Sequence, residues 1–369
     1  MFAENNQISG RQAARLLIFD LLGYSALLIP SALAASAGND GIFSIGIGIV
    51  AGFLYLKLLI KVSCKMSDSY STGLVELFGK TAGNLMKIGY LIYFLLLAGR
   101  VTAILGELVV SELLEKQFQL VIILVLVLVY YGVAGGIESR ARVYEILFWI
   151  LLIPLGIMLL FAIRTVDTDY WMPVFTDGIG GILSGSYQVF LCVSILCLVP
   201  FFAEYVNKKE DIYRCAKKAL GWTGTILSVV YLILLGMFGK DALATLSYPA
   251  VTMMSRIQMT GGFLKRADAL MFGIWFFTLY ALINSLVFFA GKLWNTGKCW
   301  NENKKYADFW LIGEIIAVYF LANAFYHSKE LEMLYERFFK YIGTPFVIFV
   351  PAGAAVLLHF REKTGEEEK

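Results

Sequence analysis

The feature that most constrains this chain is a succession of apolar runs, each about 20 residues long, that are separated by short polar connections. A helix needs about 20 mostly apolar residues to cross a bilayer. Only 16% of the residues are charged, whereas soluble domains carry about 25%. The sequence therefore predicts an all-α integral membrane protein, a single polytopic domain over 1–369 with about ten transmembrane helices. The predicted spans are 13–37, 41–62, 84–110, 118–135, 143–163, 183–204, 220–238, 267–291, 308–326 and 341–360.

The basic residues indicate how these spans are oriented. Connections on the side of the N-terminus are rich in lysine and arginine, including Arg140 and Arg142, and those on the other side carry fewer. Cytoplasmic loops are enriched in these residues. We therefore expect a multi-pass membrane protein with both termini in the cytoplasm. The net charge of +3 does not indicate nucleic acid as a partner.

One connection on the outer side is long, about 239–266, and contains Tyr248-Pro249. Proline is favoured in the first turn of a helix, so we expect a short helix that begins at Pro249. Two interpretations stay open: a lid or interfacial helix on the outer face, or an ordinary amphipathic loop.

Two spans carry helix-weakening residues. The first contains Gly23-Tyr24-Ser25-Ala26 followed by Pro30, and the sixth contains Ser194-Ile195-Leu196 followed by Pro200. Glycine and proline weaken helices, and paired interruptions in corresponding helices are typical of transporter binding sites. We expect helices one and six to be broken around a ligand site at the membrane midplane. The alternative is a simple proline kink in each.

Several ionisable and hydroxyl-bearing side chains fall inside the predicted spans. Such charges are costly in a bilayer and are functional candidates, although structural ion pairing is the alternative. Tyr93 and Tyr280 place hydroxyl groups within spans, where they serve either packing or ligand contact. The candidate intramembrane charges are Asp20, Arg100, Glu107, Glu145 and Glu204.

The sequence gives no sign of catalytic or cofactor chemistry. The five cysteines lack the spacing of a metal site, and the two histidines, His327 and His359, do not suggest a catalytic triad. A phosphate-binding GxxxxGK[ST] loop is absent from the sequence. We expect no enzymatic activity and no cofactor.

Motifs distributed along residues 7–360 resemble the spore-germinant-receptor B-subunit family, also called spore germination permeases. The order and spacing of the motifs over ten spans carry the resemblance. They are Ile8-Ser9-x-x-Gln12, Leu22-Gly23 with Leu28-Ile29-Pro30, Gly136-Ile137-Glu138-Ser139-x-Ala141-Arg142, Tyr248-Pro249, Arg266-x-Asp268 and Trp275.

This resemblance implies the amino acid–polyamine–organocation fold, with two inverted five-helix repeats at about 11–163 and 183–326 and a final helix at about 341–360. It also implies the inner membrane of a spore, A-type and C-type receptor subunits as partners, and a small amino acid as germinant. Two residues depart from the fold's usual pattern. Ser25 stands where many relatives have a second glycine, which predicts a slightly tighter cavity, and the sixth span has no glycine at its break, which argues against unwinding there. The ligand-binding residues that the resemblance implies are Gly23, Tyr24, Ser25, Ala26, Tyr93, Ser194, Ile195, Leu196, Phe277, Tyr280 and Asn284.

The resulting hypothesis is a germinant-sensing membrane subunit. The ligand's carboxylate would meet backbone N–H groups freed at the break in the first span, and its ammonium would meet carbonyl groups freed in the sixth. The alternatives are a proton- or sodium-coupled amino acid permease, with Asp20, Glu145 or Glu204 as coupling carboxylates, and a structural scaffold with a collapsed cavity.

Overall fold

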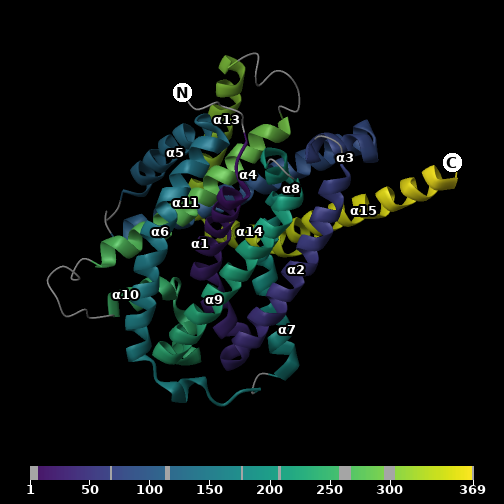
Figure 1. Cartoon of the computed structure of the whole chain (residues 1–369). Coiled ribbons are helices and arrows are strands. Elements are labelled where there is room, and N and C mark those ends of the chain that lie inside the picture. Colours follow the sequence, from purple (N-terminus) through teal and green to yellow (C-terminus); the bar gives the residue numbers. More distant parts are fainter. Residues whose placement is uncertain are drawn as a thin grey trace.

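The computed structural model describes residues 7–66, 69–112, 117–175, 178–206, 209–256, 267–294 and 304–367. These residues are almost entirely helical and form one bundle (Figure 1). The long helices are α1 (Gly10–Ala37), α2 (Gly41–Lys65), α4 (Lys80–Glu112), α5 (Phe118–Ala134), α6 (Gly136–Ala162), α9 (Lys209–Thr245), α11 (Ala267–Trp294), α13 (Lys304–His327) and α15 (Thr344–Glu367). The sixth span consists of α7 (Gly178–Val193), the 3₁₀ turn η4 (Ser194–Leu198) and α8 (Val199–Phe202).

The number of spans agrees with the prediction. Eight stretches within the described ranges are long and apolar enough to cross a membrane. The first of them, Gly10–Lys65, contains both α1 and α2, which makes nine spans among the described residues. The apolar helix α5, with 17 residues, makes the tenth. Large apolar side chains are exposed on the bundle surface, among them Leu54, Ile146 and Leu160. A soluble protein would bury such residues, whereas lipid solvates them.

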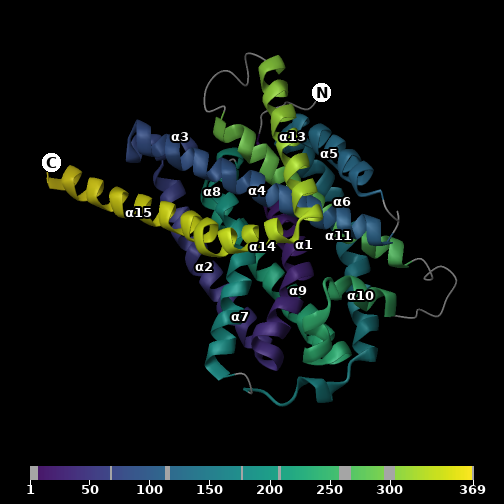
Figure 2. The same ribbon diagram turned by 180° about the vertical axis from the view of Figure 1, so that it is seen from behind.

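Helix α1 lies at the centre of the bundle and packs against α9, α7, α11 and α6 (Figures 1 and 2). A helix that is apolar all round must be buried, and most of α1 is. Helix α15 runs outward, so that its C-terminal end lies apart from the other long helices (Figure 2). Both termini lie toward one end of the bundle, here called the N-terminal end. The other end, called the opposite end, carries η3 (Thr168–Trp171) and α10 (Pro249–Arg256).

The prediction of a broken first span is wrong for this structure, because α1 is α-helical without interruption from Gly10 to Ala37. Gly23 serves close packing instead of unwinding. A Cβ atom added there would lie 2.5 Å from Cβ of Thr278 and 3.1 Å from its carbonyl carbon. The Ser25 hydroxyl donates to the carbonyls of Leu21 and Leu22, at 2.5 and 3.2 Å, within the same helix. The backbone N–H groups of this segment are therefore part of the helix and are not freed for a ligand carboxylate.

The predicted interruption of the sixth span is present, but as a 3₁₀ turn and not as unwound backbone. The α-helix ends at Val193 and is replaced by the 3₁₀ turn η4 before α8 begins. Pro200 has no N–H group to donate to the turn before it. The Ser194 hydroxyl donates to the Leu191 carbonyl at 2.5 Å, and such side-chain bonds compete with helical ones.

A second correction concerns the fourth connection. Gly136 has a φ of +75°, which glycine adopts without strain, and α6 begins there, seven residues before the predicted span. Arg140 and Arg142 therefore lie on the first turns of a helix and not in a loop. Arg142 is exposed, but Arg140 points inward and is only 3% exposed.

The short helix predicted at Pro249 is present as α10. It packs against α1, α9 and α11, with Met253 buried, so it is a docked helix and not a free loop. Residues 257–266, including Arg266 of the motif, lie outside the described residues. Two further short helices were not predicted: α3 (Tyr70–Phe78) and α14 (Lys329–Phe338), the latter followed by the π-helical turn η7 (Phe339–Gly343). The division into two inverted repeats stays a prediction.

Candidate functional site

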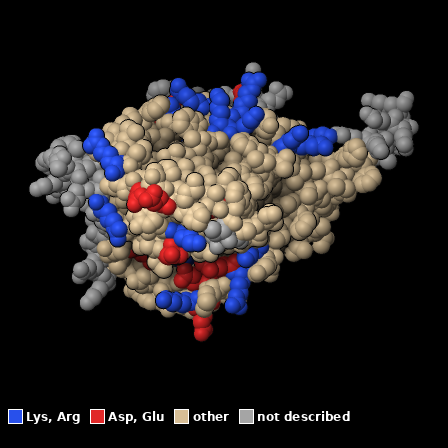
Figure 3. All heavy atoms as spheres, turned by 90° about the horizontal axis from the view of Figure 1, so that it is seen from below, with Lys and Arg blue, Asp and Glu red and all other residues tan. Residues whose placement is uncertain are grey.

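A cavity of about 830 Å³ lies between α1, α7, the end of α9, and α14 with η7. Tyr24 and Leu28 of α1 and Leu191 and Cys192 of α7 line one wall, and Tyr335 lines the other. Figure 3 views the molecule from the opposite end, where acidic side chains gather in one region with basic side chains beside them. The cavity is large enough for a small ligand, and it brings the first and sixth spans to one surface.

Two of the predicted site residues meet directly beneath this cavity. The hydroxyl groups of Tyr93 on α4 and Ser194 at the break in the sixth span lie 3.2 Å apart, and both residues are buried. Phe339 of η7 stacks on Tyr93, with ring centroids 5.2 Å apart, and itself lines the cavity. Tyr335 in turn stacks on Phe339 at 5.6 Å. Tyr93 thus contacts the lining of the cavity through Phe339.

The other predicted residues of spans one and six lie within helical segments. Gly23, Ser25 and Ala26 lie within the continuous helix α1, where Ser25 and Ala26 are buried. Ile195 and Leu196 are buried within η4. The structure thus brings Tyr24, Tyr93 and Ser194 close to the cavity and makes the others part of the packing around it.

The predicted residues of α11 face away from the cavity. The Tyr280 hydroxyl donates to the Leu128 carbonyl of α5 at 2.8 Å, and the Asn284 side chain donates to the Tyr280 carbonyl at 2.9 Å. The Phe277 carbonyl accepts a bond of 3.4 Å from Tyr144 of α6. The face of α11 that meets α1 instead carries Thr278, against Gly23, and Ser285.

A buried polar cluster joins α1, α6 and α11 in the N-terminal half of the bundle. The Ser285 hydroxyl donates to Asp20 at 2.7 Å and accepts from the Arg140 guanidinium at 2.6 Å. Asp20 is fully buried. Sequence reasoning found Asp20 but missed Arg140 and Ser285. The signal for Arg140 was its place in the Gly136–Arg142 motif, next to a predicted span.

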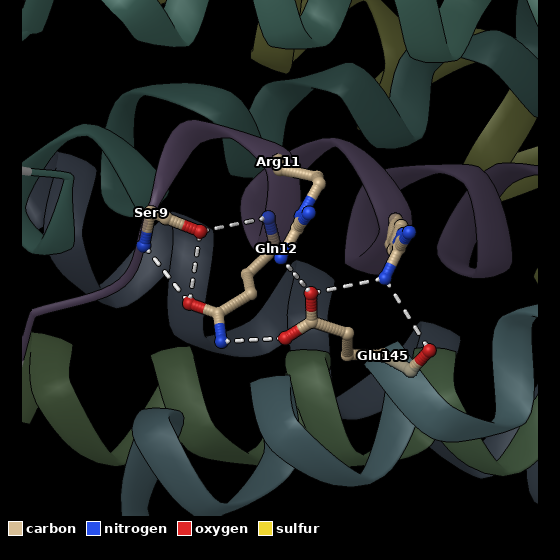
Figure 4. A network of polar contacts seen from close by, with 5 residues as sticks. Ser9, Arg11, Gln12 and Glu145 are labelled. Carbon is tan, nitrogen blue, oxygen red and sulfur yellow. Dashed lines mark hydrogen bonds and ion pairs between the residues drawn. The ribbon is translucent and has the colours of Figure 1, made fainter.

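Glu145 organises a second layer of contacts at the N-terminal end (Figure 4). Its carboxylate lies 2.6 Å from Arg11 and 3.1 Å from Arg15, and it accepts a 3.0 Å bond from Gln12. Gln12 and Ser9 form a reciprocal capping box at the start of α1. These contacts hold the first turns of α1 against α6.

The first residues of the described chain also bind the end of the sixth span. The Ile8 N–H donates to the Tyr205 carbonyl at 2.7 Å, and Ile8 forms an isolated parallel bridge with Val206. Together with the Glu145 layer and the Asp20 cluster, this contact closes the N-terminal end of the bundle, whereas the cavity lies toward the opposite end.

The remaining predicted charges have structural partners. Glu204 accepts the Tyr70 N–H at 3.0 Å, at the start of α3, where a carboxylate is favoured by the helix dipole. Glu107 accepts the Tyr248 hydroxyl at 2.5 Å. Burial and the neighbouring Glu107 raise the pKa of Tyr248, so this hydroxyl stays a neutral donor.

One carboxyl group within a predicted span was missed. Glu314 is 7% exposed and lies on the buried face of α13, in line with Leu311 and Val318, toward α4. Its Oε2 atom makes no hydrogen bond among the described residues. The signal was a single acidic residue inside an apolar run.

These features define a class: a multi-pass α-helical membrane protein with a cavity between its first and sixth spans. A solved structure described as the substrate-bound outward-open state of a Na⁺-coupled sialic acid symporter shares this fold, with a TM-score of 0.68 over 93% of this chain and 78% of that one, at 15% identity.

The family model described as "Spore germination protein" matches residues 7–329, and the chain belongs to that family. Spore germination protein KB of Bacillus subtilis (strain 168) is 24% identical over 99% of this chain and 98% of that protein. Spore germination protein YndE of the same organism is 23% identical over 79% and 81%. The chain is thus a germinant-receptor or permease-like membrane protein and not an enzyme.

Proposed function

We propose that this protein is the germinant-sensing membrane subunit of a spore germination receptor and that it binds a small amino acid. Membership of the spore germination family supports a role in germination. The fold shared with a solved symporter supports recognition of a small molecule. In this proposal the protein lies in the spore inner membrane with its N-terminal end in the cytoplasm, and it acts together with A-type and C-type subunits.

The observation that carries the proposal is the cavity of about 830 Å³ that reaches Tyr24 of α1 and Cys192 of α7. Cys192 lies two residues before the break in the sixth span. The ligand would enter from the opposite end and bind at this floor, above Tyr93 and Ser194. Aromatic and aliphatic side chains around the floor favour a small, largely apolar amino acid.

The response would be a shift between two packings of the bundle. A ligand that binds one packing better than the other changes their populations by its difference in affinity, and a change from 1:99 to 99:1 takes about 5.5 kcal/mol. The contacts of Ile8, Glu145 and Asp20 hold the N-terminal end closed. Partner subunits would detect whether these contacts stay in place.

The second candidate is a coupled amino acid permease. The observation that favours it is Asp20, a buried carboxylate on α1 whose Oδ1 atom has no hydrogen-bond partner in the described structure. Such a group is suited to bind a proton or a cation during transport. A collapsed scaffold is the third candidate, and the size of the cavity argues against it.

Two measurements test the proposal. The purified protein is screened for thermal stabilisation by the twenty proteinogenic L-amino acids, since a ligand at 100 times its Kd should stabilise by about 2.7 kcal/mol. Uptake of radiolabelled ligand into proteoliposomes is then measured. Stabilisation without uptake supports the sensor, and uptake supports the permease. If no amino acid stabilises the protein and none is taken up, the scaffold is supported.

A matched pair of variants tests the site. Cys192→Trp should fill the floor of the cavity and abolish stabilisation by the amino acid. Cys64→Trp replaces an exposed cysteine of α2 and should leave it unchanged. Equal ligand responses in the two folded variants would place the ligand elsewhere.

A further inference from the structure

Arg100 is a buried cation in the wall of the cavity. It lies on α4, seven residues beyond Tyr93, which is about 10 Å along the helix toward the opposite end. Its side chain is 9% exposed and lines the cavity. A buried guanidinium needs anionic partners, because leaving its charge unpaired is costly.

Of the two carboxylates beside Arg100, only one accepts a hydrogen bond from it. Glu332 accepts a short hydrogen bond from Nη2 of Arg100. Glu107 lies 4.0 Å from Nη1, which is beyond hydrogen-bond distance, and its other oxygen accepts from Tyr248. The Nη1 atom makes no hydrogen bond among the described residues. Arg100, a residue of the cavity wall, therefore carries a buried donor that no described residue uses.

Glu332 comes from α14, whose backbone packs mainly against α13 and η7, the elements that flank it in the chain. Its contact with Arg100 thus joins α14 to α4 across the cavity wall. The next turn of α14 carries Tyr335 and Glu336, which line the same cavity. The Glu332 carboxylate thus binds the same guanidinium, that of Arg100, that would attract the carboxylate of an incoming ligand.

We propose that Arg100 binds the carboxylate of a zwitterionic amino acid and that Glu332 occupies this position until the ligand displaces it. The inference rests on the proposed function and specifies its ligand chemistry. A guanidinium presents two parallel N–H donors that match a carboxylate, and Nη1 and Nη2 form such an edge. The exchange replaces one carboxylate by another, so Arg100 stays paired throughout.

The ligand's ammonium group would be bound by carboxylates of the same cavity wall. Once Glu332 leaves Arg100, it and Glu336 present carboxylates to the ligand's ammonium group. This assignment takes the place of the backbone N–H groups of α1, which are engaged within the helix. Release of Glu332 also removes the ion pair between α14 and α4, so ligand binding is coupled to the position of α14.

Two consequences are measurable. An amino acid amide keeps the ammonium but has no carboxylate, so it should bind about tenfold or more weakly than its parent. Removing the internal competitor should strengthen binding, so Glu332→Gln should bind the parent amino acid about fivefold more tightly or better while still rejecting the amide.

The experiment uses the full chain in lipid nanodiscs and titrates it with each amino acid that stabilises the wild type and with the matching carboxamide. Arg100→Gln should bind the two with nearly equal affinity. The matched control is Arg164→Gln, which changes an exposed arginine at the same end of the bundle, outside the cavity; it should keep the wild-type preference.

The outcomes separate the two claims. If no amino acid binds the wild type, the proposed function fails. If one binds and folded Arg100→Gln keeps the preference for acid over amide, the inference about Arg100 is wrong. Should Arg100→Gln not fold, Glu332→Gln decides alone: unchanged or weaker binding of the amino acid overturns the proposal, and tighter binding supports it.

Discussion

The buried cluster of Asp20, Ser285 and Arg140 gives a prediction whose size follows from its geometry. The two bonds that meet at the Ser285 hydroxyl measure 2.6 and 2.7 Å, so the cationic nitrogen and the carboxylate oxygen are no more than about 5 Å apart. At an effective dielectric constant of about 20, unit charges at that separation attract by about 3 kcal/mol. Breaking a buried pair by removing one partner costs about 3–5 kcal/mol.

We therefore predict that Arg140→Met destabilises the protein by about 3–5 kcal/mol, because it leaves the Asp20 carboxylate buried without its cation. The double variant Asp20→Asn/Arg140→Met should cost less than the sum of the single changes by about 2–3 kcal/mol. The assay is reversible unfolding in mixed micelles of non-ionic detergent and SDS, followed by far-ultraviolet circular dichroism.

Arg142→Met is the matched control. This arginine lies two residues away in the same helix, is half-exposed, and pairs with Glu138 one turn earlier at 3.0 Å. Exposed pairs contribute about 0–1 kcal/mol, so its loss should be nearly silent. If Arg140→Met costs no more than Arg142→Met, or if the Asp20 and Arg140 changes are additive, then the cluster is not a coupled ion pair and the reasoning fails.

Two further predictions rest on single contacts, and a third tests the proposed orientation. Gly23→Ala should destabilise by about 1–3 kcal/mol, because its Cβ meets Thr278; Gly46→Ala, which has open space around it, should be neutral or stabilising in the same unfolding assay. Tyr93→Phe should cost about 1 kcal/mol through loss of its bond to Ser194, and an unchanged unfolding midpoint would show that this bond contributes nothing. In intact cells expressing the protein, a membrane-impermeant maleimide should label Asp169→Cys at once but native Cys64 only after permeabilisation; the reverse order would invert the proposed orientation.

The spans could be predicted from the sequence because hydropathy is a sum over about 20 residues, and errors at single positions cancel. The start of α6 could not, since Glu138, Arg140 and Arg142 lower the hydropathy of a segment that is nonetheless helical. The helix brings Arg140 to face a carboxylate on another helix. Hydropathy treats each charge alone and does not register such pairing.

The candidate site was predictable only in part, for a geometric reason. Each residue of a helix turns its side chain by about 100° relative to the one before, so the face that meets a neighbour depends on packing across the whole bundle. For α11 the prediction selected Tyr280 and Asn284, which contact α5 or their own helix. Thr278 and Ser285, which meet α1, are as polar and as close in the sequence. Nothing within α11 distinguishes the two faces.

The continuity of α1 changes how the two ends of the bundle can communicate. Tyr24 contacts the cavity, Asp20 lies one turn along the same helix, and Gln12 binds Glu145 at its first turn. From Tyr24 to Gln12 the helix is about 18 Å long. A helix broken at Gly23 would bend there and absorb a displacement caused by the ligand. If a ligand binds as proposed, an uninterrupted helix would carry that displacement to the Asp20 cluster and to the Glu145 layer, whose hydrogen bonds and ion pairs are direct. Gly23, which the sequence analysis assigned to a break, thus serves the close packing of α1 against Thr278 of α11.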